Sequence, residues 1–396
     1  GYTMTAAPAL DENYFAALSQ ALKEAGIAEP TLVIDRQRLD HNIETLLDDL
    51  PEGMGYRIVA KSLPSVGLIR HIRTRTGSDR LMTFNIEMLL ALAGEMPEAE
   101  QLLGKPMPVA AARRFYSEAN PDANIKWLVD TPTRAEQYLA LAAELEITMQ
   151  LVLEVDVGLH RGGFAPDDAL VNTVRSIDRS NQATFAGLMG YEPHVAKMPE
   201  KGGLRKAALQ SAWSIFSKAK AMTCASRTAS GLILNAAGSP TYRLYRDTEV
   251  ANEVSVGSVL VKPTDFDTPL LAPHWPASFI ATPALKVLDG INIAGFEFVR
   301  GRQPDLPEGH DKTVYIFGGN WMAEPVWPES VVLNDTYGRS SNQQMLTAPS
   351  TTPIEPDEYV FLRPKQSESV FLQFGDIAVF ENGRISETWP VFHASA

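Results

Sequence analysis

The sequence predicts an α/β protein in which a (β/α)8 barrel is followed by an antiparallel β domain. Short, continuous apolar runs recur along the first two thirds of the chain, and helix-like stretches separate most of them. This alternation is typical of parallel strands covered by helices. Eight such runs over about two hundred residues match the usual size of a closed barrel. Beyond about residue 266 prolines cluster, and alternating apolar runs between turn residues indicate antiparallel strands.

The predicted elements follow in order along the chain. A first helix covers 12–26, where apolar side chains recur at helical spacing up to Gly26. The eight barrel strand candidates are 56–60, 81–84, 101–103, 126–129, 148–155, 184–190, 231–234 and 256–261. The helix candidates between them are 86–94, 109–118, 132–145, 166–178 and 203–222, and the connection from 235 to 255 lacks a clear helix. The later strand candidates are 284–288, 313–317, 358–362 and 369–380.

This pattern divides the chain into three parts. Residues 1–29 form an N-terminal helical segment that packs on the β domain, residues 30–265 form the barrel, and residues 266–396 form the β domain. A doubly wound open sheet is the structural alternative for the middle part. No Gly-x-Gly-x-x-Gly follows any strand candidate, which disfavours a dinucleotide-binding fold.

Composition excludes several classes of function. The chain has 396 residues and a net charge of −13, so phosphate backbones would repel it and nucleic-acid binding is not expected. The single cysteine, Cys224, allows no disulfide within the chain and fits a reducing compartment. No signal-peptide pattern and no apolar run near ~18 residues is found, so we expect a cytoplasmic protein that does not enter the membrane.

The first strand candidate ends in Lys61. A lysine that closes an apolar strand of a barrel faces the mouth, where chemistry gathers, and partial desolvation there favours the neutral amine. Such an amine can form a Schiff base with an aldehyde cofactor. The alternative is a lysine that simply reaches water.

Three other strand ends carry candidate site residues. The segment from Asn235 to Thr241 includes Gly238 and Ser239, and its backbone N–H groups and hydroxyls could hold a phosphate, as loops after strands seven and eight often do. Gly257 and Ser258, assigned to the eighth strand, could complete this site. The fifth strand leads into Glu154…Asp156…Arg161, and the sixth ends in Gly190-Tyr191-Glu192-Pro193-His194, with Tyr191 and His194 as proton-transfer candidates. As alternatives, the 235–241 segment could be an ordinary turn, the segment from Glu154 to Arg161 a salt-bridged loop, and His194 a structural histidine.

Together these segments resemble fold-type III enzymes that depend on pyridoxal 5'-phosphate (PLP), specifically the D-threonine aldolase and D-serine dehydratase family of amino-acid aldolases and racemases. The resemblance runs from about Pro30 to Asp376. Its marks, in the family's order, are Thr31–Asp35 with Asn42, Arg57…Lys61, Asp156-Val157-Gly158…Arg161-Gly162-Gly163, Gly190–His194, Gly238–Thr241, Glu253…Gly257 and Ser367-Glu368…Gly375-Asp376.

The resemblance implies an alanine-racemase-like barrel followed by a β domain, and it implies PLP as the cofactor. It implies that Lys61 holds PLP and abstracts the substrate α-proton, that Arg161 and Tyr191 lie near the cofactor, and that the Gly238–Thr241 loop binds its phosphate. It also implies a homodimer whose active sites are shared between subunits.

One departure from the family bears on the reaction. Aldolases and dehydratases of this family carry a metal pair, a His followed two positions later by Cys or Asp, but the stretch Ile377–Ile385 after Asp376 contains no His. No two histidines in the sequence have the short spacing of a metal site, so no metal is expected. In a second departure, Val259 stands where many relatives have a Tyr that contacts the phosphate.

The sequence therefore predicts a PLP enzyme that acts on a small D-amino acid, most plainly a lyase for a D-β-hydroxy amino acid with His194 as the acid or base. An amino-acid racemase is the alternative, with a second base from Tyr315, Tyr337 or Tyr359 of the partner subunit. A non-catalytic PLP carrier and a PLP-free phosphate-binding barrel are the remaining alternatives.

Overall fold

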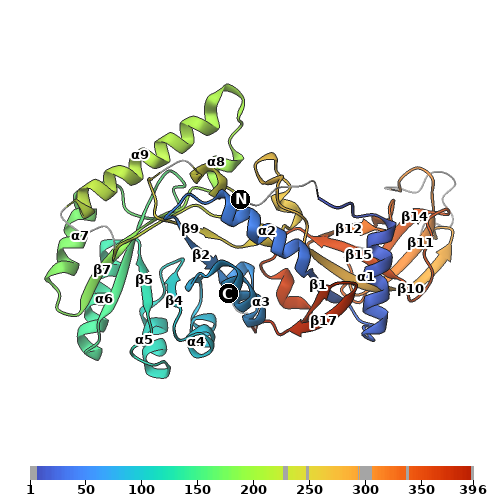
Figure 1. Ribbon diagram of the computed structural model, residues 1–396, viewed down its shortest axis with the longest axis horizontal. Coiled ribbons are helices and arrows are strands. Elements are labelled where there is room, and N and C mark those ends of the chain that lie inside the picture. Colours follow the sequence, from blue (N-terminus) through green and yellow to red (C-terminus); the bar gives the residue numbers. More distant parts are fainter. Residues whose placement is uncertain are drawn as a thin grey trace.

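The computed structural model describes residues 7–225, 231–246, 249–292, 294, 306–335 and 339–393. Eight parallel strands close into a barrel, which confirms the predicted fold class (Figure 1). These strands are β2 (Gly55–Val59), β3 (Arg80–Thr83), β4 (Glu100–Leu103), β5 (Ile125–Val129), β6 (Met149–Val155), β7 (Ala183–Gly190), β8 (Ile233–Ala236) and β9 (Glu253–Val256).

Helices cover the outside of the barrel because each buries one apolar stripe against the strands. They are α2 (Arg36–Asp49), α3 (Val66–Thr76), α4 (Ile86–Glu95), α5 (Val109–Glu118), α6 (Pro132–Leu145), α7 (Asp168–Arg179), the short α8 (His194–Lys197) and α9 (Leu204–Cys224). Between β8 and β9 the described residues form only a 3-10 turn, Tyr242–Tyr245, in agreement with the weak helical pattern there. No helix within the described ranges is both long enough and apolar enough to cross a membrane.

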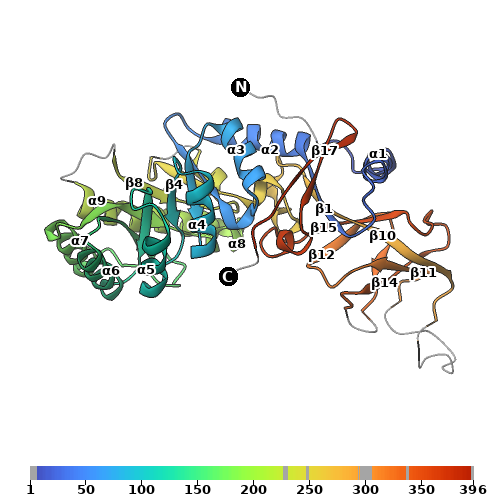
Figure 2. The same ribbon diagram turned by 90° about the horizontal axis from the view of Figure 1, so that it is seen from below.

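The C-terminal part of the chain forms a separate, mostly antiparallel sheet (Figure 2). Its strands are β1 (Thr31–Asp35), β10 (Ser278–Asp289), β11 (His310–Phe317), β12 (Ala323–Trp327), β13 (Val332–Leu333), β14 (Gln343–Pro349), β15 (Tyr359–Pro364), β16 (Ile377–Glu381) and β17 (Arg384–Trp389). Helix α1 (Glu12–Glu24) lies on this sheet, where Phe15, Leu18 and Leu22 pack with Phe279 and Phe361 (Figure 1).

Strand β1 departs from the predicted division at residue 30. It belongs to the second sheet, pairing antiparallel with β10 and parallel with β16. Leu32 and Ile34 join the large core while Val33 joins the core under α1, so both faces of β1 are covered. A strand buried on both faces has the same continuous apolar run as a barrel strand, and the sequence pattern could not distinguish the two.

Two smaller predictions need correction. The eighth barrel strand was predicted over 256–261 but ends at Val256, so Gly257 and Ser258 follow the strand instead of lying in it. The run 369–380 was predicted as strand, yet Val370–Gln373 is a 3-10 turn and only Ile377 onward is extended. In both stretches apolar residues are buried in turns. The periodicity of apolar residues alone cannot distinguish such a turn from a strand.

Candidate active site

A cavity of about 310 Å³ opens at the carboxyl ends of the barrel strands. Its size lies at the lower end of the range for small-molecule sites. A second cavity of about 720 Å³ adjoins it, and the two share Lys61, Glu154, Arg161 and Glu368. Eight of the predicted site residues line the first cavity: Lys61, Arg161, Tyr191, Asn235, Gly238, Ser239, Gly257 and Ser258.

Lys61 lies in the turn Ala60–Ser62 that directly follows β2. Its Nζ is 4.2 Å from the centroid of the Phe84 ring and 3.6 Å from Oε1 of Glu368. The side chain is 39% exposed, so the desolvation expected from the sequence is only partial, and the amine faces both an aromatic ring and a carboxylate. The amine is thus held at the cavity by one aromatic ring and one ion pair.

Another part of the cavity wall is rich in hydrogen-bond donors. Oγ of Ser239 accepts hydrogen bonds from the N–H groups of Gly257, at 3.2 Å, and Val259, at 3.1 Å. Within the described ranges the N–H groups of Gly238 and Ser239 have no hydrogen-bond partner, although both residues are buried. A buried N–H without a partner is costly, and adjacent ones form an anion-binding concavity.

Two glycines allow this wall to pack closely. A Cβ at Gly238 would lie 2.7 Å from Cε2 of Tyr191, and one at Gly257 would lie 2.9 Å from Cβ of Val59. Any larger residue would therefore push the wall away from its neighbours. Glycine is required at both positions because the backbone passes so close to neighbouring side chains. The same lack of a side chain lets backbone N–H groups come within reach of a ligand.

Arg161 and Tyr191 lie together beside the cavity. The guanidinium of Arg161 is 5.9 Å from the centroid of the Tyr191 ring, and Arg161 has no ion pair in the described part of the chain. Burial, followed by the nearby Glu192, raises the pKa of Tyr191 to about 12, so its hydroxyl stays protonated at neutral pH and can donate a hydrogen bond.

Glu154, the penultimate residue of β6, is an acidic group that the sequence analysis noted at a strand end without giving it a role. Burial, and then the neighbouring carboxylate of Asp130, raises the pKa of Glu154 to about 7, although Arg161 acts in the opposite direction. Among the described residues, no hydrogen-bond partner is found for the side-chain carboxyl of Glu154, although its backbone carbonyl accepts from the N–H of Phe164 at 2.7 Å. A carboxyl that is half protonated at neutral pH is suited to proton transfer. Its position two residues before Asp156, at a barrel strand end, was the available signal.

Glu368 is the other site residue that the sequence analysis left without a role. It comes from the C-terminal domain, and its Oε1 also accepts a hydrogen bond from Oγ of Ser62 at 3.2 Å. The adjacent Ser367 is fully buried, with its Oγ 3.1 Å from Oγ of Ser258. The second domain of the same chain therefore closes part of the cavity, which no local sequence pattern could indicate.

Two predicted site residues do not reach either cavity. His194 is the first residue of α8 and lies against Gly158, where a Cβ would be 3.0 Å from its Nε2. The start of α8 directly after Pro193 places His194 beside the loop that follows β6. Thr241 is fully buried, and its Oγ1 donates to Oε1 of Glu192 instead of facing the cavity.

The tyrosines considered as a second base differ in availability. Tyr359 is 5% exposed and its hydroxyl donates to the carbonyl of Ile27, so it cannot enter a partner's site. Tyr315 lies on β11, with Nζ of Lys286 5.5 Å from its ring centroid. Tyr337 lies outside the described residues. The stretch Ile377–Ile385, where relatives carry a metal pair, forms the hairpin of β16 and β17.

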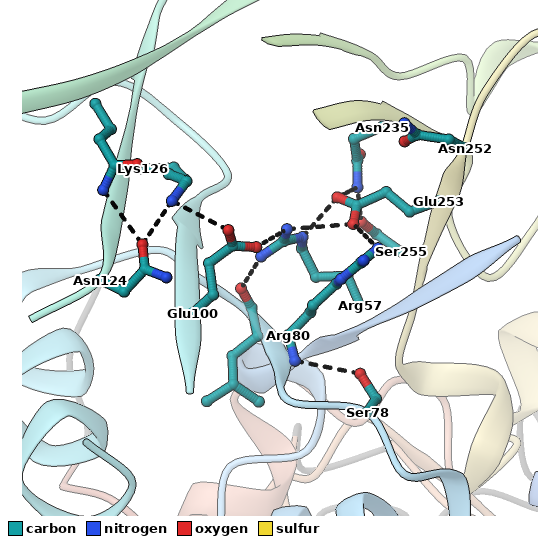
Figure 3. A network of polar contacts seen from close by, with 12 residues as sticks. Arg57, Ser78, Arg80, Glu100, Asn124, Lys126, Asn235, Asn252, Glu253 and Ser255 are labelled. Atoms are coloured by element: carbon teal, nitrogen blue, oxygen red, sulfur yellow. Dashed lines mark hydrogen bonds and ion pairs between the residues drawn. The ribbon is translucent and has the colours of Figure 1, made fainter. Parts of the chain in front are cut away.

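A polar network lies within the barrel beneath the cavity (Figure 3). Arg57 is fully buried, its Nε donates to Oε1 of Glu253 at 2.7 Å, and its Nη2 donates to Oε2 of Glu100 at 2.6 Å. Burial alone would lower the pKa of Arg57, but the carboxylates of Glu253 and Glu100 raise it above its ordinary value. Asn235, which lines the cavity, donates to Glu253 at 3.0 Å and so connects the network to the cavity floor.

Comparisons with known proteins agree with this geometry. The family model for the alanine racemase N-terminal domain matches residues 34–265. Biosynthetic alanine racemase of Salmonella typhimurium is 27% identical over 141 residues, an alignment that spans 35% of this chain and 37% of that protein.

Solved structures resemble nearly the whole chain. D-threonine aldolase from Filomicrobium marinum has a TM-score of 0.72 at 16% identity, covering 91% of this chain and 94% of that one. D-threo-3-hydroxyaspartate dehydratase from Delftia sp. HT23 has a TM-score of 0.72 at 15% identity, covering 92% and 98%. At such low identity these likenesses establish the fold.

The family model covers more than half of the chain and includes every element that builds the barrel. The family resemblance noted in the sequence is thereby confirmed, together with the enzymatic class and the cofactor that it implied. The chain belongs to the family defined by the alanine racemase N-terminal domain, the fold-type III enzymes that depend on PLP.

Proposed function

We propose that this enzyme is a lyase for a small D-β-hydroxy amino acid, with PLP held covalently by Lys61. The observation that carries the proposal is that Nζ of Lys61 and the unpartnered N–H groups of Gly238 and Ser239 belong to residues lining one cavity of about 310 Å³. PLP carries an aldehyde and a phosphate at different positions on its ring, so it needs an amine and an anion site in the same cavity.

The residues around the cavity fit this cofactor. The N–H groups of Gly238 and Ser239, with the hydroxyl of Ser258, would hold the phosphate, and Arg161 and Tyr191 would contact the rest of the cofactor. When bound, PLP supplies an electron sink for the charge that develops at the substrate Cα. A Cβ at Gly238 or Gly257 would clash with its neighbours and displace the backbone of this anion site.

The protein's own residues would move two protons. In dehydration the Lys61 amine, once free of the cofactor, would take the proton from Cα of the substrate. In cleavage the Cα–Cβ bond breaks instead, and the protonated Lys61 amine would return a proton to Cα. The Glu154 carboxyl, whose pKa is raised to about 7, takes a proton from the β-hydroxyl in cleavage or gives one to the leaving hydroxyl in dehydration. We assign this second role to Glu154 because His194, the candidate from the sequence, does not line the cavity.

A racemase is the second candidate, and the similarity to Salmonella alanine racemase favours it. Racemisation requires a second base on the opposite side of the substrate Cα. We propose that the enzyme forms a homodimer with shared active sites, in which Tyr315 of the partner subunit would be that base in a racemase. Light scattering of the purified protein tests the dimer.

Cofactor attachment is tested by the visible absorbance of the purified protein after addition of PLP. We expect a visible band that borohydride abolishes, and no such band in Lys61→Ala. Lys105→Ala is the matched control. Lys105 lines only the second cavity of about 720 Å³, so this variant should keep the band. A colourless wild-type protein that never takes up PLP would overturn the proposal.

The reaction is tested by incubating D- and L-amino acids with the enzyme, with and without a chelator. Release of an aldehyde from a D-β-hydroxy amino acid marks an aldolase, and release of a keto acid marks a dehydratase. Loss of optical activity without release marks a racemase. Loss of activity with the chelator would contradict the absence of a metal that the sequence predicts.

A further inference from the structure

A buried carboxylate, Glu192, lies behind the donor-rich wall of the cavity. Glu192 follows β7, is 1% exposed and does not itself line either cavity. Its Oε2 accepts hydrogen bonds from the N–H of Ala237 at 3.2 Å and from the hydroxyl of Tyr245 at 2.8 Å. Its Oε1 accepts from Oγ1 of Thr241.

All three donors come from one segment, residues 237–245, which also carries Gly238 and Ser239. Glu192 therefore holds this segment at its beginning, middle and end. The segment is not a regular strand or α-helix, and the part between Ala237 and Thr241 has little repeating hydrogen bonding of its own. The carboxylate adds three contacts to the turn hydrogen bonds that Thr241 and Tyr242 make with the carbonyl of Gly238.

The backbone at Ala237 supports this view. Ala237 has a φ of 67°, a left-handed conformation that is unfavourable for any residue with a Cβ. Such a conformation persists only where surrounding contacts enforce it, and the N–H of Ala237 is one of the groups bound to Glu192. The next two N–H groups along the chain, those of Gly238 and Ser239, are the ones without a partner in the described part of the chain.

We propose that Glu192 is a positioning residue that fixes the 237–245 segment so that the N–H groups of Gly238 and Ser239 are available to a phosphate monoester. This inference rests on the proposed function, since the phosphate is that of PLP. The three donors bind both oxygens of the carboxyl group, and Glu192 is separated from the cavity by the segment it holds. Glu192 thus shapes the anion site without touching the anion.

The test compares PLP with pyridoxal, which has the same aldehyde and ring but no phosphate. Dissociation constants of both are measured from visible absorbance for the wild type and Glu192→Gln. The amide places an N–H against one of the three donors, so we expect PLP to bind about 10–100-fold more weakly, the loss typical of a buried donor left unpaired. Pyridoxal affinity should change by no more than about twofold, since it makes no use of the anion site.

Tyr138→Phe is the control for a general loss of stability. Tyr138 is fully buried on α6 and its hydroxyl donates to the carbonyl of Met107 at 2.8 Å, away from the cavity. This variant should lower the melting temperature but leave the ratio of PLP to pyridoxal affinity as in the wild type. Tyr245→Phe removes one of the three donors with little change in volume, and it should lower the ratio by a smaller factor if Glu192→Gln does not fold.

The outcomes separate the two proposals. If the wild type binds neither PLP nor pyridoxal, the proposed function is wrong. If the wild type prefers PLP and both Glu192→Gln and Tyr245→Phe keep that preference, Glu192 has only a structural role and the inference is overturned. A loss of preference for PLP in either variant supports it.

Discussion

The two ends of the barrel treat charge in opposite ways. At the amino ends of the strands, Arg57, Arg80 and Lys126 are paired with Glu253 and Glu100 in one connected network (Figure 3). At the carboxyl ends, within the described ranges, the side-chain carboxyl of Glu154 accepts no hydrogen bond and Arg161 has no ion pair, and Asp130 lies close enough to Glu154 to raise its pKa.

This difference indicates that the amino end of the barrel contributes stability and the carboxyl end carries the chemistry. A buried charge is tolerable when it is paired, and the amino-end network meets this condition. Groups that bind a ligand or transfer a proton must keep free capacity, and at the carboxyl end the Glu154 carboxyl, the Arg161 guanidinium and two backbone N–H groups are left without partners in the described part of the chain. Substitutions at the amino ends should therefore mainly lower the stability of the fold, and substitutions at the carboxyl ends should mainly lower activity.

The largest effect is expected for Arg57→Met. It leaves the buried carboxylate of Glu253 without its closest cation, so we expect a loss of about 3–5 kcal/mol in the free energy of unfolding, measured by urea denaturation. Arg161→Met, at the other end, is the matched control and should change that free energy by no more than about 0.5 kcal/mol. Equal losses in the two variants would contradict the comparison.

Glu154→Gln should reduce turnover about 100-fold, because it removes the proposed acid or base. The wild-type pH profile should show one limb centred near pH 7, where Glu154 titrates, and the variant should lack it. Activity that rises through pH 7 indicates that Glu154 acts as a base, as cleavage requires; activity that falls indicates an acid, as dehydration requires. An unchanged limb in the variant would remove Glu154 from the mechanism.

The same variant should be more stable than the wild type in alkaline solution. The pKa of Glu154 is raised in the folded state, so the wild type loses stability as pH rises from the ordinary carboxyl range through about 7. Glu154→Gln escapes this loss, and we expect it to gain about 1–2 kcal/mol at pH 8 and almost nothing at pH 4. Urea denaturation at both pH values measures the gain, and a destabilised variant at pH 8 would contradict the assignment.

The smallest effect is expected for Glu368→Gln. The ion pair between Glu368 and Lys61 is long and partly exposed, so it contributes little to stability. Its loss should still free the Lys61 amine from its ion pair and speed PLP uptake at pH 7.5 about 2–5-fold, as measured by the growth of visible absorbance. Ser62→Ala, which removes only the hydrogen bond to Glu368, should leave the rate close to that of the wild type.

The repeating parts of the fold could be predicted from the sequence. Helices α5 and α6 have the predicted bounds, and seven of the eight barrel strands fall within two residues of their predicted positions, because period and turn residues are local properties. The position of Lys61 followed in the same way, since the end of a barrel strand is defined by where its apolar run stops.

The contacts that complete the site could not be predicted in this way. Strand β1 lies within the range predicted for the barrel, 30–265, but pairs with β10 and β16. His194 is three residues from Tyr191 in the sequence, yet it does not reach the cavity. Glu368 enters the site from the other domain, more than three hundred residues from its partner Ser62. A local sequence pattern does not indicate which distant segments meet at the same cavity.

By itself, the sequence determined the class of the molecule: a barrel with a β domain, a lysine at a strand end and small residues where a phosphate loop is expected. The tertiary structure decided which carboxyl groups serve the site. Glu154, Glu192 and Glu253 are the same residue type, but one is unpaired at the cavity, one holds a loop and one neutralises a buried arginine. The role of a charged group depends on its partners and its burial, and both are properties of the folded chain.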